Sequence, residues 1–212
     1  GFAESVARLA GGLSRRLAPG DRVGLVMKNC PEYAEAMFAC WHAGLVAVPI
    51  NAKLHPRELE YILGHSGCRL CFATPELHSG VAGLTVPGMD SVVEVGGSAW
   101  DALFTAPIEV GARTADDAAW LFYTSGTTGR PKGIRRQLPT AEQVARTLER
   151  SRLCYGAEPG MRALLNAPIY HSAPNAYATT VSQVEHATLL IEQRFDAERT
   201  LHGHRHLGAV EV

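Results

Sequence analysis

The residues best suited to chemistry lie in one loop rich in hydroxyl groups and glycine, residues 123–133. It follows an apolar run and reads Tyr-Thr-Ser-Gly-Thr-Thr-Gly-Arg-Pro-Lys-Gly. Three glycines let successive backbone N–H groups face an anion, and Lys132 supplies a positive charge without a competing carboxylate. Further donors come from the hydroxyls of Thr124, Ser125, Thr127 and Thr128. These groups together are suited to binding a polyphosphate.

The loop does not have the Walker A pattern, in which a glycine, four residues, a second glycine and a lysine are followed by Ser or Thr. Counting from Gly126, the second glycine position is Pro131, and Gly133 follows the lysine. The sequence therefore excludes a P-loop NTPase but keeps the phosphate-binding interpretation. The alternative is an ordinary solvated turn, which the preceding strand and the following lysine disfavour.

Residues 123–133 closely resemble the signature loop of the adenylate-forming superfamily, which includes acyl-CoA synthetases, adenylation domains of peptide synthetases and luciferases. A second block, residues 166–175, reads Asn-Ala-Pro-Ile-Tyr-His-Ser-Ala-Pro-Asn and resembles a family segment in order and distance. Residues 21–29 and 44–52 resemble the family more loosely. The likeness covers nearly the whole chain and is closest to bacterial acyl-CoA synthetases that act on fatty or aromatic acids.

This resemblance implies a two-step ligase that uses ATP, Mg²⁺ and coenzyme A. A carboxylic acid attacks the α-phosphate of ATP to give an acyl adenylate and pyrophosphate, and a thiol then takes the acyl group. By this likeness, His171 lies near the reacting carboxylate and Tyr170 shapes the acyl pocket. The residues implied to hold the β- and γ-phosphates are Thr124, Ser125, Gly126, Thr127, Thr128, Gly129 and Lys132.

The resemblance also implies that residues 1–212 are part of an N-terminal adenylation domain, with the C-terminal domain absent from this chain. The family's adenine, ribose and late lysine residues are not found in it. Residues 133–139 depart from the family pattern, which leaves the substrate subclass open. Two alternatives stay open as well: a fragment that binds nucleotide or pyrophosphate without turnover, and an adenylation domain that serves a carrier protein.

The elements that must position these residues alternate between strands and helices. Aliphatic strands separated by amphipathic helices predict a doubly wound α/β fold, with a largely parallel sheet covered by helices on both faces. The predicted helices span residues 1–17, begin near Pro31, Pro56, Ser98 and Thr140, and span residues 178–186 and 197–202. The predicted strands are residues 22–27, 45–50, 69–74, 91–95, 118–123, 163–167 and 187–191, and another begins in residues 207–212.

Composition excludes other classes. Lys and Arg number 20 against 21 Asp and Glu, so the formal net charge of −1 disfavours a nucleic-acid partner. The apolar runs are too short to cross a bilayer of about 30 Å, so we expect no transmembrane segment. Five cysteines and no visible secretory leader favour the cytoplasm. A homodimer is left open.

Three other features could indicate a function but also have a purely structural interpretation. Cys68 and Cys71 have the spacing of a metal or redox pair, with His65 nearby, but one pair in an aliphatic strand favours buried thiols and no metal site. His202, His204 and His206 could bind a metal only in an extended segment that places them on one face. The helix predicted at residues 197–202 disfavours this and favours a solvated end. Arg135 and Arg136 either steer ATP or form an exposed pair.

Overall fold

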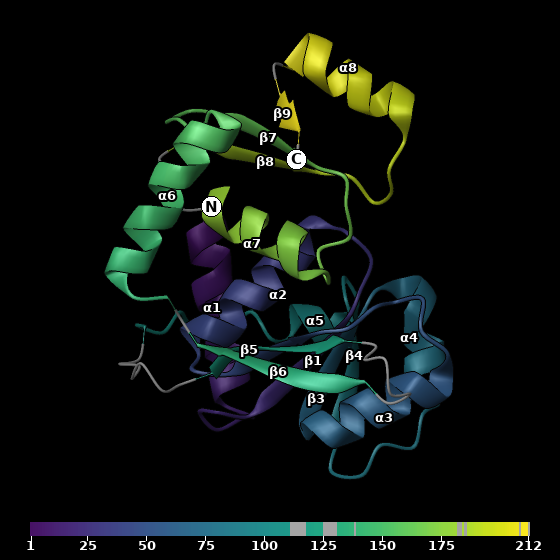
Figure 1. The fold of residues 1–212 in the computed structure, drawn as a ribbon. Helices are drawn as coiled ribbons and strands as arrows, with labels where there is room; N and C mark the ends of the chain where they lie inside the picture. Colours follow the sequence, from purple (N-terminus) through teal and green to yellow (C-terminus); the bar gives the residue numbers. More distant parts are fainter. Residues whose placement is uncertain are drawn as a thin grey trace. The chain divides into compact units, whose positions relative to one another are not determined.

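The computed structural model describes residues 1–110, 118–124, 131–137, 139–181, 184, 186–207 and 209–211 (Figure 1). The chain divides into two compact units. Unit 1 comprises Gly1–Met27 and Glu32–Leu138, and unit 2 comprises Lys28–Pro31 and Pro139–Val212. Among the helices in the described ranges, none has the length and apolar character needed to span a membrane.

Unit 1 is built on a six-stranded sheet with the order β4-β3-β1-β2-β5-β6. Strands β1 to β5 run parallel, and β6 pairs antiparallel with β5. The parallel strands are aliphatic because helices cover both of their faces. The strands are β1 (Arg22–Val26), β2 (Val46–Pro49), β3 (Cys68–Ala73), β4 (Ser91–Glu94), β5 (Ala118–Thr124) and β6 (Lys132–Gln137).

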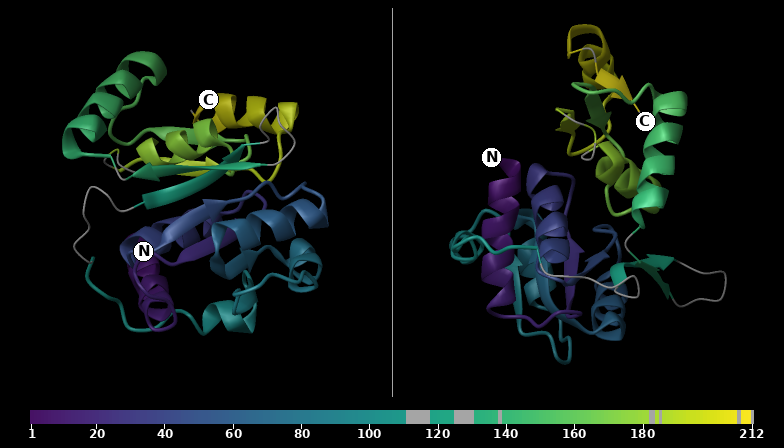
Figure 2. Two further views of the ribbon diagram at one scale, coloured as in Figure 1. Left: turned by 60° about the horizontal axis from the view of Figure 1, so that its bottom comes forward. Right: turned by 90° about the vertical axis from the view of Figure 1, so that its left-hand side faces the viewer.

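Helices lie on both faces of this sheet, as the sequence predicts. They are α1 (Phe2–Ser14), α2 (Pro31–His42), α3 (Pro56–Ser66), α4 (Pro75–Ala82) and α5 (Ser98–Asp101). Figure 2 shows α1 and α2 side by side, and the rings of Trp41 in α2 and Trp120 in β5 pack 4.4 Å apart. On the other face α3 crosses β1, where a Cβ on Gly24 would lie 2.7 Å from Leu63 Cδ2. The doubly wound interpretation is therefore confirmed.

Local sequence signals explain the ends of several elements. His55 Nδ1 accepts a hydrogen bond from the Arg57 amide at the start of α3, and Gly67 ends that helix in the left-handed region with φ of 67°. Gly44 after α2 has φ of 78°, as its predicted capping role requires. Within α1, Gly12 approaches the backbone of Leu103 so closely that a Cβ would lie 1.9 Å from the carbonyl oxygen.

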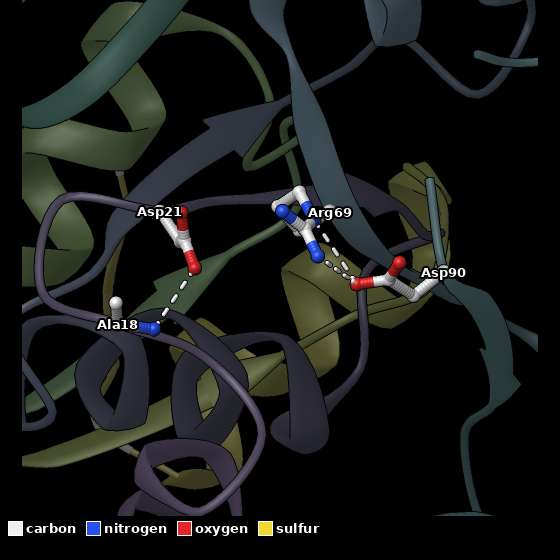
Figure 3. A network of polar contacts seen from close by, with 4 residues as sticks. All are labelled: Ala18, Asp21, Arg69 and Asp90. Carbon is white, nitrogen blue, oxygen red and sulfur yellow. Dashed lines mark hydrogen bonds and ion pairs between the residues drawn. The ribbon is translucent and has the colours of Figure 1, made fainter. Parts of the chain in front are cut away.

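Polar contacts brace the amino-terminal edge of the sheet (Figure 3). The Arg69 guanidinium donates through Nε and Nη2 to Asp90 Oδ2, at 3.0 and 2.8 Å, which joins the start of β3 to the residue before β4. Asp21 Oδ2 accepts a hydrogen bond from the Ala18 amide at 2.9 Å and closes the turn that leads into β1. The hydrogen bonds that Arg69 donates to Asp90 raise the pKa of Arg69, so this arginine stays charged.

Unit 2 contains a three-stranded parallel sheet with the order β8-β7-β9. Its strands are β7 (Arg162–Leu165), β8 (Thr188–Ile191) and β9 (Ala209–Glu211), and its helices are α6 (Ala141–Tyr155), α7 (Ser172–Val181) and α8 (Ala197–Leu207). Helix α6 begins with the predicted capping box: the Gln143 amide donates to Thr140 Oγ1 and the Thr140 amide donates to Gln143 Oε1.

Several element predictions need correction. The glycine- and proline-rich residues 75–88 contain α4, and residues 132–137 form a strand that was not predicted. Helix α7 covers Ser172–Val181 rather than residues 178–186, because its first turn forms directly after His171, whose carbonyl accepts from the Asn175 amide at 3.0 Å. Gly97, and not Ser98, is the N-cap of α5.

Candidate active site

The stem of the predicted phosphate loop is the β5–β6 hairpin. Thr124 ends β5, Lys132 begins β6, and the two residues are cross-strand partners with exposed side chains. The structure therefore brings together the first and last of the predicted phosphate-binding residues. The intervening predicted residues, Ser125, Gly126, Thr127, Thr128 and Gly129, lie outside the described part of the chain.

The hairpin stem lies at the edge of the sheet where α/β proteins bind ligands. Because β5 runs parallel to β2, Thr124 is at the same edge as the carboxyl ends of β1 to β4. Ligands of open α/β sheets bind outside the carboxyl ends of the strands. The position of the stem is therefore consistent with a phosphate site.

Tyr123 anchors this stem to α3. Strand β5 pairs with β2 at one register position, Ala47 with Trp120, so the later residues of β5 need other attachments. The Tyr123 hydroxyl oxygen lies 2.7 Å from Nδ1 of His65, in the last turn of α3, and the two rings meet edge to face at 5.8 Å. The cross-strand partner of Tyr123 is Gly133, where a Cβ would lie 3.3 Å from Tyr123 Cζ.

The hydroxyl of Tyr123 remains protonated over the whole working pH range of a typical enzyme. Burial raises its pKa to about 12, and the neighbouring Cys68 adds to the rise. A phenol that stays protonated keeps its hydrogen-bond donor. The anchor between Tyr123 and His65 therefore does not depend on ionisation of the tyrosine.

In unit 2, His171 closes a turn between β7 and α7. Its amide donates to the Pro168 carbonyl at 3.1 Å, and α7 begins at the next residue. The buried Asn175 donates through Nδ2 to the Ile169 carbonyl at 3.2 Å. The two ends of the turn are thus fixed, which holds the exposed His171 side chain next to the amino terminus of α7.

Asn29 fixes the same turn from a distant point in the sequence. Its Nδ2 donates to the carbonyls of Ala167 and Glu192 at 2.8 and 3.0 Å, and its Oδ1 accepts from the Ile169 amide at 2.9 Å. Two of these bonds, to Ala167 and Ile169, hold the histidine turn. An alanine here would leave buried backbone groups without partners.

Tyr170 and His171 form a contact pair, with ring centroids 4.5 Å apart and planes inclined by 51°. Tyr170 is half-buried, and burial raises its pKa. The structure thus places the two predicted pocket residues next to each other, with a neutral phenol beside the histidine.

The cysteine pair consists of buried thiols, as the sequence predicts. Cys68 and Cys71 are buried free thiols, and burial raises the pKa of Cys68 to about 12 and that of Cys71 still further. Helix α8 continues to Leu207, beyond the predicted end at residue 202, so the backbone of residues 202–206 is helical. Across the described ranges there is no group of three or more His, Cys, Asp or Glu residues suited to a metal ion.

The family model of the AMP-binding enzymes matches residues 1–211. The chain belongs to the AMP-binding enzyme family. Over 192 residues, or 90% of this chain, it is 34% identical to a feruloyl-CoA synthase from Amycolatopsis sp., and the match covers 38% of that relative. The chain therefore spans well under half the length of this relative.

Solved structures of the family agree with the fold. The N-terminal domain of FACL13 from Mycobacterium tuberculosis, solved with an inhibitor, matches with a TM-score of 0.80 and 27% identity, over 94% of this chain and 51% of that chain. ATP-bound MatB from Rhodopseudomonas palustris matches with a TM-score of 0.79 and 26% identity, over 97% of this chain and 42% of that chain. The resemblance seen in the sequence is thus confirmed at the level of family and fold.

Three residues that shape the site were not predicted for these roles: His65, Asn29 and Asn175. In the sequence, His65 was noted only as a neighbour of the cysteines. Asn175 was noted only as part of residues 166–175, which resemble a family segment. The partner of His65 is Tyr123, 58 residues away in the sequence. The partners of Asn29 and Asn175 are backbone atoms. Local spacing carries no signal for such contacts.

Proposed function

We propose that the protein containing this chain is an ATP-dependent acid–thiol ligase. The observation that carries the proposal is the family match over residues 1–211, together with the loop at residues 123–133 and its hairpin stem. The name of the feruloyl-CoA synthase relative supports an acyl-CoA product. The proposed substrates are ATP, a carboxylic acid and coenzyme A.

The first step forms the acyl adenylate. A carboxylate oxygen attacks the α-phosphorus of ATP, the bond to the bridging oxygen breaks, and pyrophosphate leaves. Lys132 places a positive charge beside the departing β- and γ-phosphates, and the Thr124 hydroxyl donates to them. Backbone and hydroxyl groups of Ser125, Gly126, Thr127, Thr128 and Gly129 complete the proposed phosphate site.

Mg²⁺ fits this site as an ion carried by the nucleotide. The described residues contain no metal-binding cluster, but Mg²⁺ in nucleotide enzymes takes most of its ligands from phosphates and water. The exposed Thr124 hydroxyl at the end of β5 is a suitable protein oxygen. When bound, the ion supplies positive charge to the phosphates.

The second step transfers the acyl group. The thiolate of coenzyme A attacks the acyl carbonyl carbon and AMP leaves. His171 and Tyr170 are the proposed residues beside the reacting carboxyl group, and the fixed turn at residues 166–171 holds them in place. We assign residues 1–212 to the N-terminal adenylation domain and place the protein in the cytoplasm, with a homodimer as one assembly to test.

Carboxylate-dependent exchange of pyrophosphate into ATP tests the first step. A panel of aliphatic and aromatic acids is incubated with the protein, ATP, Mg²⁺ and labelled pyrophosphate. We expect exchange with at least one acid, and absence of exchange with every acid overturns the ligase proposal. Calorimetric binding of ATP without exchange would instead support a binding fragment. Adding coenzyme A or a carrier protein to the preformed adenylate then identifies the acyl acceptor.

A further inference from the structure

Unit 1 contains a cavity that the ligase proposal does not use. It has a volume of about 410 Å³ and lies over the sheet face that carries α3, bounded on its far side by the β5–β6 hairpin. Residues that line it include Arg22, His65, Ser66, Tyr123, Gly133 and Arg135. This volume is within the range of small-molecule sites.

The cavity carries unbalanced positive charge. Arg22 begins β1, Arg135 lies in β6, and among the described residues that line the cavity none has a carboxylate. In the described ranges neither guanidinium takes part in an ion pair, whereas Arg69 on the neighbouring strand β3 is held by Asp90 (Figure 3). Two arginines on opposite sides of one cavity, with no acidic partner in the described part of the chain, are a feature of anion sites.

The register of the hairpin places only one of its two adjacent arginines in this cavity. Arg135 pairs with Leu121 and shares its side of the hairpin with Gly133 and Tyr123. Arg136 lies on the opposite side, with its guanidinium 5.7 Å from the centroid of the Phe122 ring. The sequence left the two arginines equivalent, and alternation along the strand gives them different surroundings.

Neutral side chains and the glycine at position 133 complete the lining of the cavity. At Gly133 a Cβ would lie 3.2 Å from Leu121 Cδ1 and 3.3 Å from Tyr123 Cζ, so a longer side chain there would intrude on the space beside these residues. The Tyr123 and His65 rings, which meet edge to face, provide an aromatic wall. Burial raises the pKa of Tyr123 to about 12 while Arg22 acts in the opposite direction, so the charge of Arg22 reaches the phenol.

We propose that this cavity binds a phosphate group between Arg22 and Arg135. Strands β1 and β6 are three strand spacings apart, roughly 14 Å, and two arginine side chains reach into the space between them. A phosphate dianion matches two guanidinium forks in charge and geometry. The volume exceeds that of one phosphate, which leaves room for an organic group against the Tyr123 and His65 rings.

Titration calorimetry in a Lys132→Ala background tests the site apart from the phosphate loop. The probes are inorganic phosphate and phenyl phosphate, at fixed ionic strength. We expect binding that Arg22→Gln and Arg135→Gln each weaken by at least about tenfold, because each change removes one charge-assisted contact. Tighter binding of phenyl phosphate assigns the site to phosphate esters, and equal affinities assign it to free phosphate.

Arg136→Gln is the matched control, since it removes the same charge one residue away on the opposite side of the hairpin. We expect it to change either affinity by less than about twofold. An equal loss in the Arg135→Gln and Arg136→Gln variants would show general electrostatic attraction and overturn the proposal, as would absence of binding at millimolar probe. All three arginines are exposed, so the variants should keep their thermal unfolding midpoints. Phosphate binding in this cavity is measured without pyrophosphate exchange, so failure of the cavity proposal and failure of the ligase proposal can be told apart.

Discussion

The Tyr123 hydroxyl oxygen lies 2.7 Å from Nδ1 of His65, and this contact joins the stem of the phosphate loop to the end of α3. Tyr123 directly precedes Thr124, which is paired with Lys132. A contact at this place restrains Thr124 and Lys132, the two described residues of the proposed phosphate site, without touching the nucleotide.

Tyr123→Phe removes the hydroxyl and keeps the ring in place. We expect the KM for ATP in pyrophosphate exchange to rise about three- to tenfold, with a smaller change in kcat, because one hydrogen bond contributes about 0.5–1.5 kcal/mol. His65→Gln should have the same direction of effect. The control is His78→Gln, which removes a histidine of the same unit that pairs with Glu94 instead. Equal effects of the two histidine changes would contradict the positioning role.

Lys132→Ala should slow adenylate formation by about a hundredfold, the scale expected for loss of one group that stabilises charge in the transition state. The side chain is exposed, so the free energy of unfolding should change by less than about 0.5 kcal/mol. Single-turnover adenylation and urea denaturation measure the two quantities. Arg15→Ala, an exposed cation at the end of α1, is the control, and an unchanged rate in Lys132→Ala would remove this residue from the site.

His171→Ala should affect use of the acid more than use of ATP. We expect kcat/KM for the acid to fall at least about tenfold while the calorimetric Kd for ATP stays within about twofold. Tyr170→Phe keeps the neighbouring ring and removes only its hydroxyl, so it should be milder. Parallel losses for acid and ATP in His171→Ala would argue against a place beside the acid.

Gly12→Ala should destabilise unit 1. Its Cβ would lie 1.9 Å from the Leu103 carbonyl oxygen, so backbone must move, and overpacking of this kind costs about 1–3 kcal/mol. Gly80→Ala in α4 is the matched control, because a Cβ there meets nothing within 4 Å and alanine favours a helix. Urea unfolding monitored by circular dichroism should show a lower free energy of unfolding for Gly12→Ala and a higher one for Gly80→Ala. A Gly12→Ala variant as stable as the wild type would contradict the close packing of α1.

Stability should fall at alkaline pH through Cys68. Burial raises the pKa of this thiol from 9.0 to about 12, so the folded chain binds the proton more tightly than the unfolded chain does. The contribution is complete below pH 9 and is lost as the pH rises to 12. Urea midpoints measured from pH 8 to 12 should fall less steeply in Cys68→Ala than in the wild type. Cys154→Ala, which removes an exposed thiol, should leave the slope unchanged.

The sequence predicted the parts of the fold that depend on local apolar pattern. Aliphatic runs such as residues 22–27 and 45–50 are strands, and the capping box at Thr140 begins α6. Strand β6 was missed because all of its side chains are exposed and include adjacent arginines, so no apolar alternation marks it. Helix α4 was missed because its sequence begins with Pro75 and contains Gly80, both typical of loops.

The sequence predicted which residues belong to the candidate site but not how they are arranged in space. Motif resemblance identified Lys132 and His171, whereas the division of the strands between two sheets and the contacts of His65 and Asn29 depend on distant parts of the chain. Such contacts leave no periodic signal, because each consists of one polar side chain whose partner is set by the tertiary fold.

The three hydrogen bonds of Asn29 have a consequence for biosynthesis. Their partners are 138, 140 and 163 residues later in the chain, so the Asn29 side chain can form these bonds only after those residues have been synthesised. Contacts with this sequence separation form slowly, since a long loop must close first. The turn that holds His171 should therefore acquire protection from hydrogen exchange later than a helix with local contacts such as α6, as the chain leaves the ribosome.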